Sequence, residues 1–562
     1  MTTPRVAVVG AGISGLATAL ALVDTGDVDV TVFEAADRVG GKINATPFAG
    51  VEGVDEGADA FLARVPEAVA LAHRVGLGDD LVSPEPVGAA IWHHELHPIP
   101  EGLMLGLPGK ILPLASTKLL TWRGKARAAL EPFLPRTSIE ADSIGDFVRA
   151  RFGNEVHERL VDSLVGSIYA ADTDRFSLAE VPQLAVLANG NRSVLLAARR
   201  QRRSQAGTAS ATATATAAAA AAASPIFATP RGGIGALVRA TADAVVAAGG
   251  RVRTGASVVS IAPTDDGCWL LDVRDEAGAQ RGTSAAPHDD NVFDAVVFAT
   301  PTSATAVALR CAAPDAADLL GRAETSDVIM VTLHVSAEQW PGRLRGLSGY
   351  LVPKPVQRWV TAVSFASQKW GHWRPPAGGE ILRVSLGRDG RTVMHLGDNE
   401  VLGVVLHDLE RHLGVAFTPD EVRITRWPAA FAQYRPHHAA WVDDVEAALP
   451  SGVFVTGAGF RGIGIPACIR AATTIATRAS GIVIWQNLGD GVTSSHRAHR
   501  RTPTRRAADR CAARTRCCRR VRHRGSRPVT RHRRDVRRRL GHDHHHHHHH
   551  CADHDHQAAD DH

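Results

Sequence analysis

Three glycines close to the N-terminus have the spacing that a diphosphate-binding turn needs. Residues 10–15 read Gly-Ala-Gly-Ile-Ser-Gly and lie between a predicted buried strand at 4–9 and a predicted helix at 13–25. The first glycine permits the tight bend, the second lets the backbone approach a pyrophosphate, and the third lets helix and strand pack closely. A second strand is predicted at 28–33, followed by Glu34, 19 residues after the third glycine, where a carboxylate can bond a ribose. The pattern predicts a dinucleotide site, because a Gly-rich surface turn would leave the spacing unexplained.

The next two blocks of sequence favour FAD over NAD, which share that fingerprint. Residues 37–43 (Asp-Arg-Val-Gly-Gly-Lys-Ile) supply two cations and two glycines just beyond Glu34. Residues 55–61 (Asp-Glu-Gly-Ala-Asp-Ala-Phe) follow. Both suit a long diphosphate cofactor whose second portion runs past the first strands.

This succession of blocks resembles the flavin-containing amine oxidase superfamily and, within it, the bacterial oxygen-dependent porphyrinogen oxidases. The resemblance spans roughly residues 4–485 and continues in Gly-Ser-Ile-Tyr-Ala-Ala-Asp at 166–172, Arg-Gly-Gly-Ile-Gly-Ala-Leu at 231–237, Arg-Trp-Pro at 426–428 with Gln-Tyr at 433–434, and Gly-Ile-Gly-Ile-Pro-Ala-Cys-Ile at 462–469. Two small departures are Ala171 and Ala467, where relatives often have Gly and Asp.

The resemblance implies FAD as the cofactor and assigns roles to particular residues. It places the FAD diphosphate against the turn formed by Gly10, Ala11, Gly12, Ile13, Ser14 and Gly15, the ribose beside Glu34 and Ala35, and Lys42 near the phosphates. The flavin would lie beside Gly57, Ala58, Asp59 and Ala60, with Trp427 near its ring and Ile463, Gly464, Ile465 and Pro466 under it. The adenine edge would meet the backbone of Val258. A pocket wall over the flavin is assigned to Ser167, Ile168 and Tyr169. Trp427 could instead be a core residue, and Lys42 a solvated cation.

Pro466 is predicted to occupy the first position of a helix that runs to Ala479, whose positive N-terminal end would face the flavin. Cys468 is interpreted as a small core residue, since no histidine lies near it in sequence.

The implied reaction is the oxidation of a porphyrinogen in haem biosynthesis, with dioxygen as acceptor and hydrogen peroxide as product. Coproporphyrinogen III is the preferred substrate, by analogy with Gram-positive relatives. Because the flavin carries the chemistry, no catalytic side chain is nominated and no metal is expected. The open alternatives are protoporphyrinogen IX oxidase and a flavin amine oxidase or carotenoid desaturase. Nucleic-acid binding is the alternative outside enzymes.

The basic charge of the chain is concentrated at its C-terminal end. The 562 residues are 44% hydrophobic with a net charge of +5, which excludes global disorder. Residues 497–562 hold 19 Arg, no Lys and 7 Asp, an excess larger than that of the whole chain, so the rest is net acidic. This tail, which includes seven consecutive histidines at 544–550, is predicted to be disordered and looks like a coding sequence read out of frame. Arginine without interleaved aromatics favours non-specific attraction, so no specific nucleic acid is expected.

The location expected from the sequence is cytoplasmic. Three scattered cysteines in the body make no disulfide framework. The apolar run at 6–23 is interrupted by glycines, unlike a signal peptide, and no transmembrane segment is predicted. Peripheral contact with a membrane and transient contact with the next enzyme of the haem pathway are compatible with this location.

The predicted fold is mixed α/β, with a Rossmann-type FAD-binding domain assembled from discontinuous segments. Those segments are 1–75, 226–310 and 425–488. The intervening parts are a mainly helical substrate- or membrane-facing domain at 76–206, a low-complexity loop at 207–225, a mixed-sheet substrate-binding domain at 311–424 and the disordered tail at 489–562.

Overall fold

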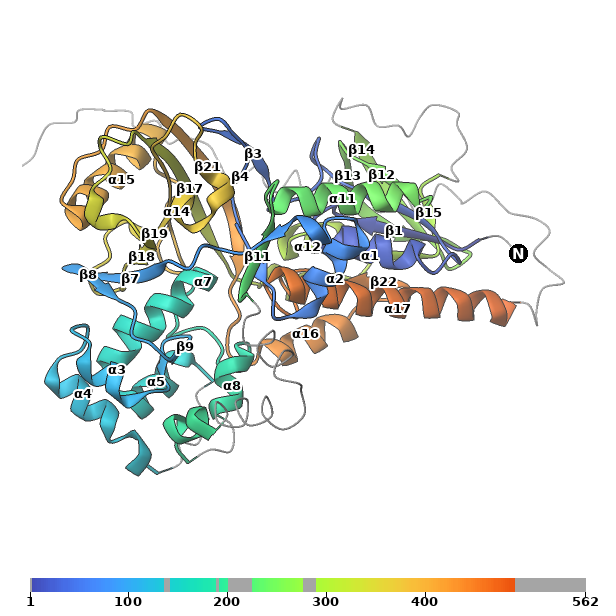
Figure 1. Cartoon of the computed structure of the whole chain (residues 1–562). Helices are drawn as coiled ribbons and strands as arrows, with labels where there is room; N and C mark the ends of the chain where they lie inside the picture. The colour runs from blue at the N-terminus through green and yellow to red at the C-terminus, as the bar shows by residue number, and fades with distance from the viewer. Residues whose placement is uncertain (1–2, 136–141, 189–191, 201–224, 276–289, 491–562) are drawn as a thin grey trace, which may run out of the picture. The chain divides into compact units, whose positions relative to one another are not determined.

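The computed structural model describes residues 3–135, 142–188, 192–200, 225–275 and 290–490 (Figure 1). Residues 207–224 of the predicted loop and 491–562 of the predicted tail lie outside this set. Residues 489 and 490, assigned to the tail from sequence, end a helix. Among the described residues, no helix is long and apolar enough to cross a bilayer.

A five-stranded parallel sheet carries the Gly-rich turn (Figure 1). Its strand order is β12-β2-β1-β16-β22, with bounds β1 (Arg5–Val9), β2 (Asp29–Phe33), β12 (Arg251–Arg253), β16 (Ala295–Phe298) and β22 (Val453–Val455). The chain therefore enters this sheet in three separate stretches. The predicted fold class, a Rossmann-type domain of discontinuous segments with an inserted mixed sheet and a helical part, is confirmed.

Successive buried side chains of β1 point to opposite faces of the parallel sheet, so both faces are covered. Val6 and Val8 join the apolar cluster that includes the helices α1, α11 and α17, whereas Ala7 and Val9 join the cluster of α12, α13 and α16. The helix bounds are α1 (Ile13–Val23), α2 (Pro66–Arg74), α11 (Ile234–Ala247), α12 (Thr302–Leu309), α13 (Pro314–Gly321), α16 (His438–Ala447) and α17 (Ile465–Asp490).

Smaller sheets and turns flank this core. They are the antiparallel sheet of β13 (Ala256–Pro263), β14 (Trp269–Asp275) and β15 (Val292–Phe293), the pair β3 (Ala45–Phe48) and β4 (Val51–Asp55), and the sheet of β5 (Phe61–Leu62), β11 (Phe227–Pro230) and β6 (Leu81–Val82), with η1 (Gly78–Asp80).

A seven-stranded mixed sheet forms the second core, packed against α15 (Asp398–Leu413). Its order is β21-β17-β20-β19-β18-β7-β8, with β7 (Gly88–His93), β8 (Glu95–Pro98), β17 (Thr325–Val335), β18 (Leu347–Leu351), β19 (Val360–Phe365), β20 (Glu380–Leu386) and β21 (Glu421–Ala432). The short helices η4 (Gly342–Leu344), α14 (Ala366–Lys369) and η5 (Gly371–Trp373) lie in its connections. Two predictions differ here: β7 and β8 come from the region predicted as mainly helical, and β21, which carries Trp427, belongs to this sheet.

The helical part gathers around a third apolar cluster that includes Phe147, Leu160 and Leu184. Its elements are β9 (Leu103–Met104), β10 (Leu107–Pro108), α3 (Ile111–Ser116), α4 (Trp122–Ala129), η2 (Glu131–Phe133), α5 (Ile144–Phe152), α6 (Asn154–Val156), the π-helix η3 (His157–Gly166), α7 (Ser167–Tyr169) and α8 (Pro182–Ala188).

Candidate functional site

The Gly-rich turn begins at the carboxyl end of β1, and its backbone is tightly constrained. Gly10 has φ +103°, and its N–H donates to the Phe33 carbonyl at 2.7 Å. A Cβ on Gly15 would lie 1.9 Å from the Gly10 carbonyl oxygen, so only glycine fits there. A Cβ on Gly12, by contrast, would meet no described atom within 4 Å. Gly10 and Gly15 therefore serve the fold, while Gly12 leaves open space.

Glu34 lies beside this turn. Its carboxylate accepts a hydrogen bond from the Ala11 N–H at 2.7 Å and another from the Ala36 N–H at 3.0 Å. Ala35 between these residues is exposed. The carboxylate is thus held beside the turn, where an acidic residue can receive ribose hydroxyls.

Among the described residues, no side chain caps the N-terminus of α1. Its N-cap, Gly12, makes no side-chain capping bond, and the first turn, which includes Ile13 and Ser14, contains no acidic residue. N–H groups without a capping side chain and the positive end of the helix dipole suit an anionic diphosphate. Together with the open space at Gly12 and the position of Glu34, this cradle fits FAD.

Lys42, Gly57 and Trp427 come together, although Trp427 lies on the mixed sheet. The Lys42 ammonium donates to the carbonyls of Ala429 and Ala430, the latter at 2.8 Å, and desolvation by surrounding protein lowers its pKa. A Cβ on Gly57 would lie 2.9 Å from the Lys42 carbonyl and 3.8 Å from the Trp427 ring. The Trp427 indole donates to the Glu56 carbonyl at 2.9 Å.

The block around Asp59 is fixed by cations from the mixed sheet. Burial opposes ionisation of Asp59, but Lys369 at 2.9 Å and Arg383 at 3.3 Å hold the pKa of its carboxyl well below the usual range. Arg383 also donates to the Gly57 carbonyl. Neighbouring Ala58 is exposed, and Ala60 packs against the apolar cluster of Trp370 and Trp373. Asp59 is therefore an anchored anion and not a proton donor at neutral pH.

Val258 lies where β13 is irregular. The register with β14 shifts between Val258 and Ser260, which is a β-bulge. Bulges leave a backbone group of the extra residue unpaired. The predicted contact of this backbone with the adenine edge remains a prediction, and the irregular register is compatible with it.

The segment Ile463–Pro466 forms the entrance to α17. The helix begins at Ile465, so Pro466 is its second residue, and it runs to Asp490, beyond the predicted end at Ala479. The N–H of Cys468 donates to the Gly464 carbonyl at 2.9 Å, which closes the first turn. Burial raises the pKa of the Cys468 thiol to about 11, in agreement with its interpretation as a core residue.

Tyr434, which sequence reasoning gave no role, holds the loop before α17. Its hydroxyl donates to the Ala458 carbonyl at 2.9 Å and accepts from the Gly462 N–H at 2.9 Å. Gly462 has φ +124°, and a Cβ there would lie 2.5 Å from the Cβ of Ala467. The only signal in the sequence was the Gln-Tyr pair at 433–434.

The predicted pocket wall, Ser167–Tyr169, follows the π-helix η3. Tyr169 is partly buried, with its ring centroid 5.1 Å from that of Phe176, whereas Ile168 is 49% exposed. Tyr169 and Ile463 pack against the same apolar cluster, so the wall and the loop before α17 share one core. Ser167 is partly exposed.

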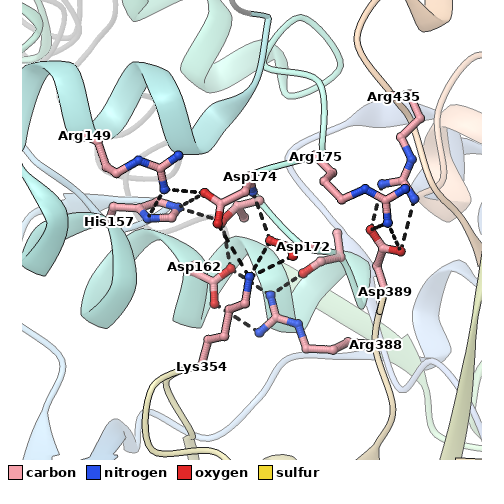
Figure 2. Close-up of polar contacts among 12 residues, drawn as sticks. Arg149, His157, Asp162, Asp172, Asp174, Arg175, Lys354, Arg388, Asp389 and Arg435 are labelled. Atoms are coloured by element: carbon pink, nitrogen blue, oxygen red, sulfur yellow. Dashed lines mark hydrogen bonds and ion pairs between the residues drawn. The ribbon is translucent and has the colours of Figure 1, made fainter. Parts of the chain in front are cut away.

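Beside this wall is a network of charged residues that the sequence did not reveal (Figure 2). Arg388 pairs with Asp162 at 2.7 Å, Lys354 with Asp172 at 2.8 Å, and Arg435 with Asp389 at 2.7 Å. The partners of each ion pair lie too far apart in the sequence for a local pattern to predict the pair.

The family of this chain follows from comparison with known proteins. The family of flavin-containing amine oxidoreductases matches residues 13–480. The coproporphyrinogen III oxidase of Bacillus subtilis (strain 168) is 30% identical over 481 residues, covering 83% of this chain and 95% of that protein. The coproporphyrinogen III oxidase of Propionibacterium freudenreichii is 33% identical over 497 residues, covering 83% and 88%.

A solved structure from Exiguobacterium sp. 255-15, provisionally named a protoporphyrinogen oxidase, is similar with a TM-score of 0.71 and 25% identity, covering 86% of this chain and 100% of that one. The chain belongs to the flavin-containing amine oxidoreductase family. The prediction of an FAD-dependent oxidoreductase is thereby confirmed.

Proposed function

We propose that this protein catalyses the FAD-dependent oxidation of coproporphyrinogen III to coproporphyrin III, with dioxygen as acceptor. The observation that carries this proposal is the similarity to two coproporphyrinogen III oxidases over 95% and 88% of their lengths. Each macrocycle would lose six hydrogens, and three dioxygen molecules would become three hydrogen peroxide molecules.

The residues proposed to hold FAD are those of the cradle. The N–H groups at the start of α1 would bind the diphosphate, Glu34 the ribose, and the segment Gly57–Ala60 with Trp427 the flavin side. Held by these residues, bound FAD would supply the acceptor for a hydride equivalent from the substrate and the route of its electrons to dioxygen.

The protein's own contribution is positioning and exclusion of water. The start of α17 would direct the positive end of a helix dipole toward the flavin. That end would stabilise the negative charge that a flavin gains on reduction. Tyr169 and Ile463 would offer an apolar wall to the macrocycle. Since Asp59 is held by two cations, it is not available as a base, and imino protons would leave to solvent.

The discriminating experiment is a parallel assay of coproporphyrinogen III, protoporphyrinogen IX and putrescine on one enzyme preparation. Porphyrin fluorescence and peroxide release would be measured together. We expect coproporphyrin III and peroxide in a ratio of one to three. Faster turnover of protoporphyrinogen IX would favour that alternative substrate. Peroxide from putrescine alone would replace the proposal with an amine oxidase.

We also propose that the helical part contacts an anionic membrane surface peripherally. Four large apolar side chains in its first helices are exposed, namely Leu112 (83%), Trp122 (73%), Leu130 (53%) and Phe133 (77%). Exposed cations Lys110, Lys118 and Arg123 accompany them in the sequence. Apolar and aromatic residues next to cations favour the interface of an anionic bilayer over water.

Vesicle sedimentation tests this contact. Replacing Trp122 and Phe133 by Ser should reduce binding to vesicles containing phosphatidylglycerol by at least ~10-fold, given the apolar area removed. Val307→Ser, at a residue 55% exposed on α12, is the matched control and should leave binding unchanged. Equal binding of both proteins would remove the proposed surface.

A further inference from the structure

The turn that follows the pocket wall is held by donors from outside the helical part. The three carbonyl oxygens of residues 169–171 all accept hydrogen bonds. Nε2 of Gln433 lies 3.4 Å from the first two oxygens, the N–H of Asp389 donates to the second at 2.9 Å, and the Arg388 guanidinium donates to the third. Gln433 and Asp389 follow β21 and β20, so the mixed sheet fixes this turn.

The conformation of the turn requires such support. Ala170 has φ +45°, in the left-handed region that residues other than glycine and asparagine rarely adopt. Such a residue persists where its surroundings over-determine it, often at ligand sites. Gly166 makes the approach possible, because a Cβ there would lie 2.6 Å from Nη2 of Arg388.

Arg388 is itself held in one orientation (Figure 2). Its two terminal nitrogens donate to the two oxygens of Asp162 at 3.0 and 2.7 Å, and the side chains of both residues are almost fully buried. Thr173 donates to the same carboxylate at 2.7 Å. A bidentate pair of this kind fixes the guanidinium plane. Buried ion pairs add little net stability over apolar packing, so what this pair supplies is direction.

The turn is coupled to the loop before α17 through a series of aromatic contacts. Tyr169 lies 5.1 Å from Phe176, and Phe176 stacks on Tyr434 at 5.9 Å between centroids. The Tyr434 hydroxyl accepts from the Gly462 N–H. A shift of the turn would therefore change the distance between the pocket wall at Ser167–Tyr169 and the loop before α17.

We propose that Arg388 and Gln433 are positioning residues for substrate, which act by fixing the turn at 169–171 and so the place of the Tyr169 ring. In this role they would act through the turn and not by contact with substrate or cofactor. The inference rests on the proposed function, in which the macrocycle lies against this wall, and it adds which residues set that wall.

Two variants test the role independently. Arg388→Lys keeps the charge but loses the fork that bonds Asp162 and Ala171 together. Gln433→Met removes the Nε2 donor, which also donates to Ser326 Oγ at 2.9 Å, and it costs no acceptor bond, because Oε1 of Gln433 has no partner among the described residues.

Arg151→Lys is the matched control. Arg151 is equally buried, pairs with buried Glu131 and donates to the carbonyls of Pro135 and Arg192, none of which belongs to the turn. Each purified holoenzyme would be compared in FAD content, melting temperature, KM and kcat for coproporphyrinogen III, and hydrogen exchange of residues 166–172.

We expect both variants to keep FAD and to lose ~10- to 100-fold in kcat/KM, the range typical of a misplaced wall. Arg151→Lys should keep kcat/KM at a comparable loss of melting temperature. Hydrogen exchange at 166–172 should accelerate in the two variants only. If exchange is unchanged in both, or if the control loses as much kcat/KM, the positioning role is wrong. A wild-type enzyme that does not oxidise porphyrinogen would defeat the proposed function, while hydrogen exchange would still decide whether these residues fix the turn.

Discussion

Gly12 and Gly15 lie three residues apart and have different roles in the turn. A Cβ on Gly15 would collide with the Gly10 carbonyl at 1.9 Å, whereas a Cβ on Gly12 meets no described atom within 4 Å. The chain itself therefore does not need a glycine at position 12. A ligand that approaches the backbone there does need one, which makes Gly12 the residue where cofactor binding can be tested without disturbing the fold.

Gly12→Val should give a folded protein that lacks FAD. The valine side chain would occupy the path of the diphosphate, while a Cβ at this position meets no described atom within 4 Å. Flavin absorbance per protein and the melting temperature of the apoprotein are the measurements. Gly403→Val is the control, since a Cβ on this exposed residue of α15 also meets nothing within 4 Å. Full flavin occupancy in Gly12→Val would mean that the turn does not bind the diphosphate.

Residues with local roles could be predicted from sequence, and residues with distant partners could not. The glycines and Glu34 belong to one strand-turn-helix-strand unit, whose spacing is a direct consequence of its geometry. Arg388 meets Ala171 across 217 residues, and Arg383 meets Gly57 across 326. No periodicity links such positions, and only the folded mixed sheet brings them to the site.

At the scale of elements, α11 begins with an unusual cap supplied by another element. Asp55, the last residue of β4, is fully buried and accepts hydrogen bonds from the N–H groups of Ile234 at 3.1 Å and Gly235 at 3.4 Å. Burial raises the pKa of the Asp55 carboxyl to about 7, with the two backbone bonds opposing this shift. One carboxyl thus caps a helix and also has a pKa near neutrality.

Asp55→Asn should flatten the dependence of stability on pH. The unfolded carboxyl ionises near pH 4 and the folded one near 7, so between these values only the folded state keeps the proton. The contribution of this group is full below the unfolded pKa and is lost as pH rises through 7. From pH 5.5 to 8.5, wild type should lose about 2 kcal/mol relative to the variant. Denaturant unfolding of both proteins at the two pH values measures this, and parallel losses would show that Asp55 does not titrate there.

The helix α17 extends further than the sequence suggested. The predicted end at Ala479 stood just before Gly481, which is a common stop signal, but the helix continues to Asp490. Glycine within a helix costs only ~1 kcal/mol, a cost that the flanking helix formers can offset. Element types were therefore predicted better than element ends.

Charge placed at the start of α17 should alter the flavin potential. Ile465→Asp would put a negative charge at the helix end proposed to face the ring, and it should lower the reduction potential by roughly 10 to 20 mV. Ile465→Asn removes the same apolar side chain without charge and is the direct control. Thr474→Asp, at an exposed position further along the helix, should have little effect. Anaerobic titration measures the three potentials; equal values for Asp and Asn at 465 would place this helix away from the ring.

At the scale of the whole molecule, the cofactor domain depends on chain segments that are far apart. The parallel sheet needs β1 and β2, then β12 and β16, then β22. Compositional breaks and the return of strand-rich sequence made this division visible. The exact domain boundaries could not be predicted, because β7, β8 and β21 join the mixed sheet from outside the range predicted for it.

A chain that ends at Asp490 should retain FAD content and kcat/KM, because the family match ends at residue 480 and every residue proposed for the site lies before it. The truncation also removes the 19 Arg of residues 497–562, which leaves a net acidic protein. Binding to duplex DNA, measured by fluorescence anisotropy between 50 and 200 mM salt, should therefore disappear, since such binding depends on cations that neutralise phosphates. Binding to anionic vesicles should decrease only to the level set by Trp122 and Phe133. Loss of flavin or turnover in the shortened chain would give the tail an essential role, and DNA binding that survives truncation would place a nucleic-acid site in the folded body.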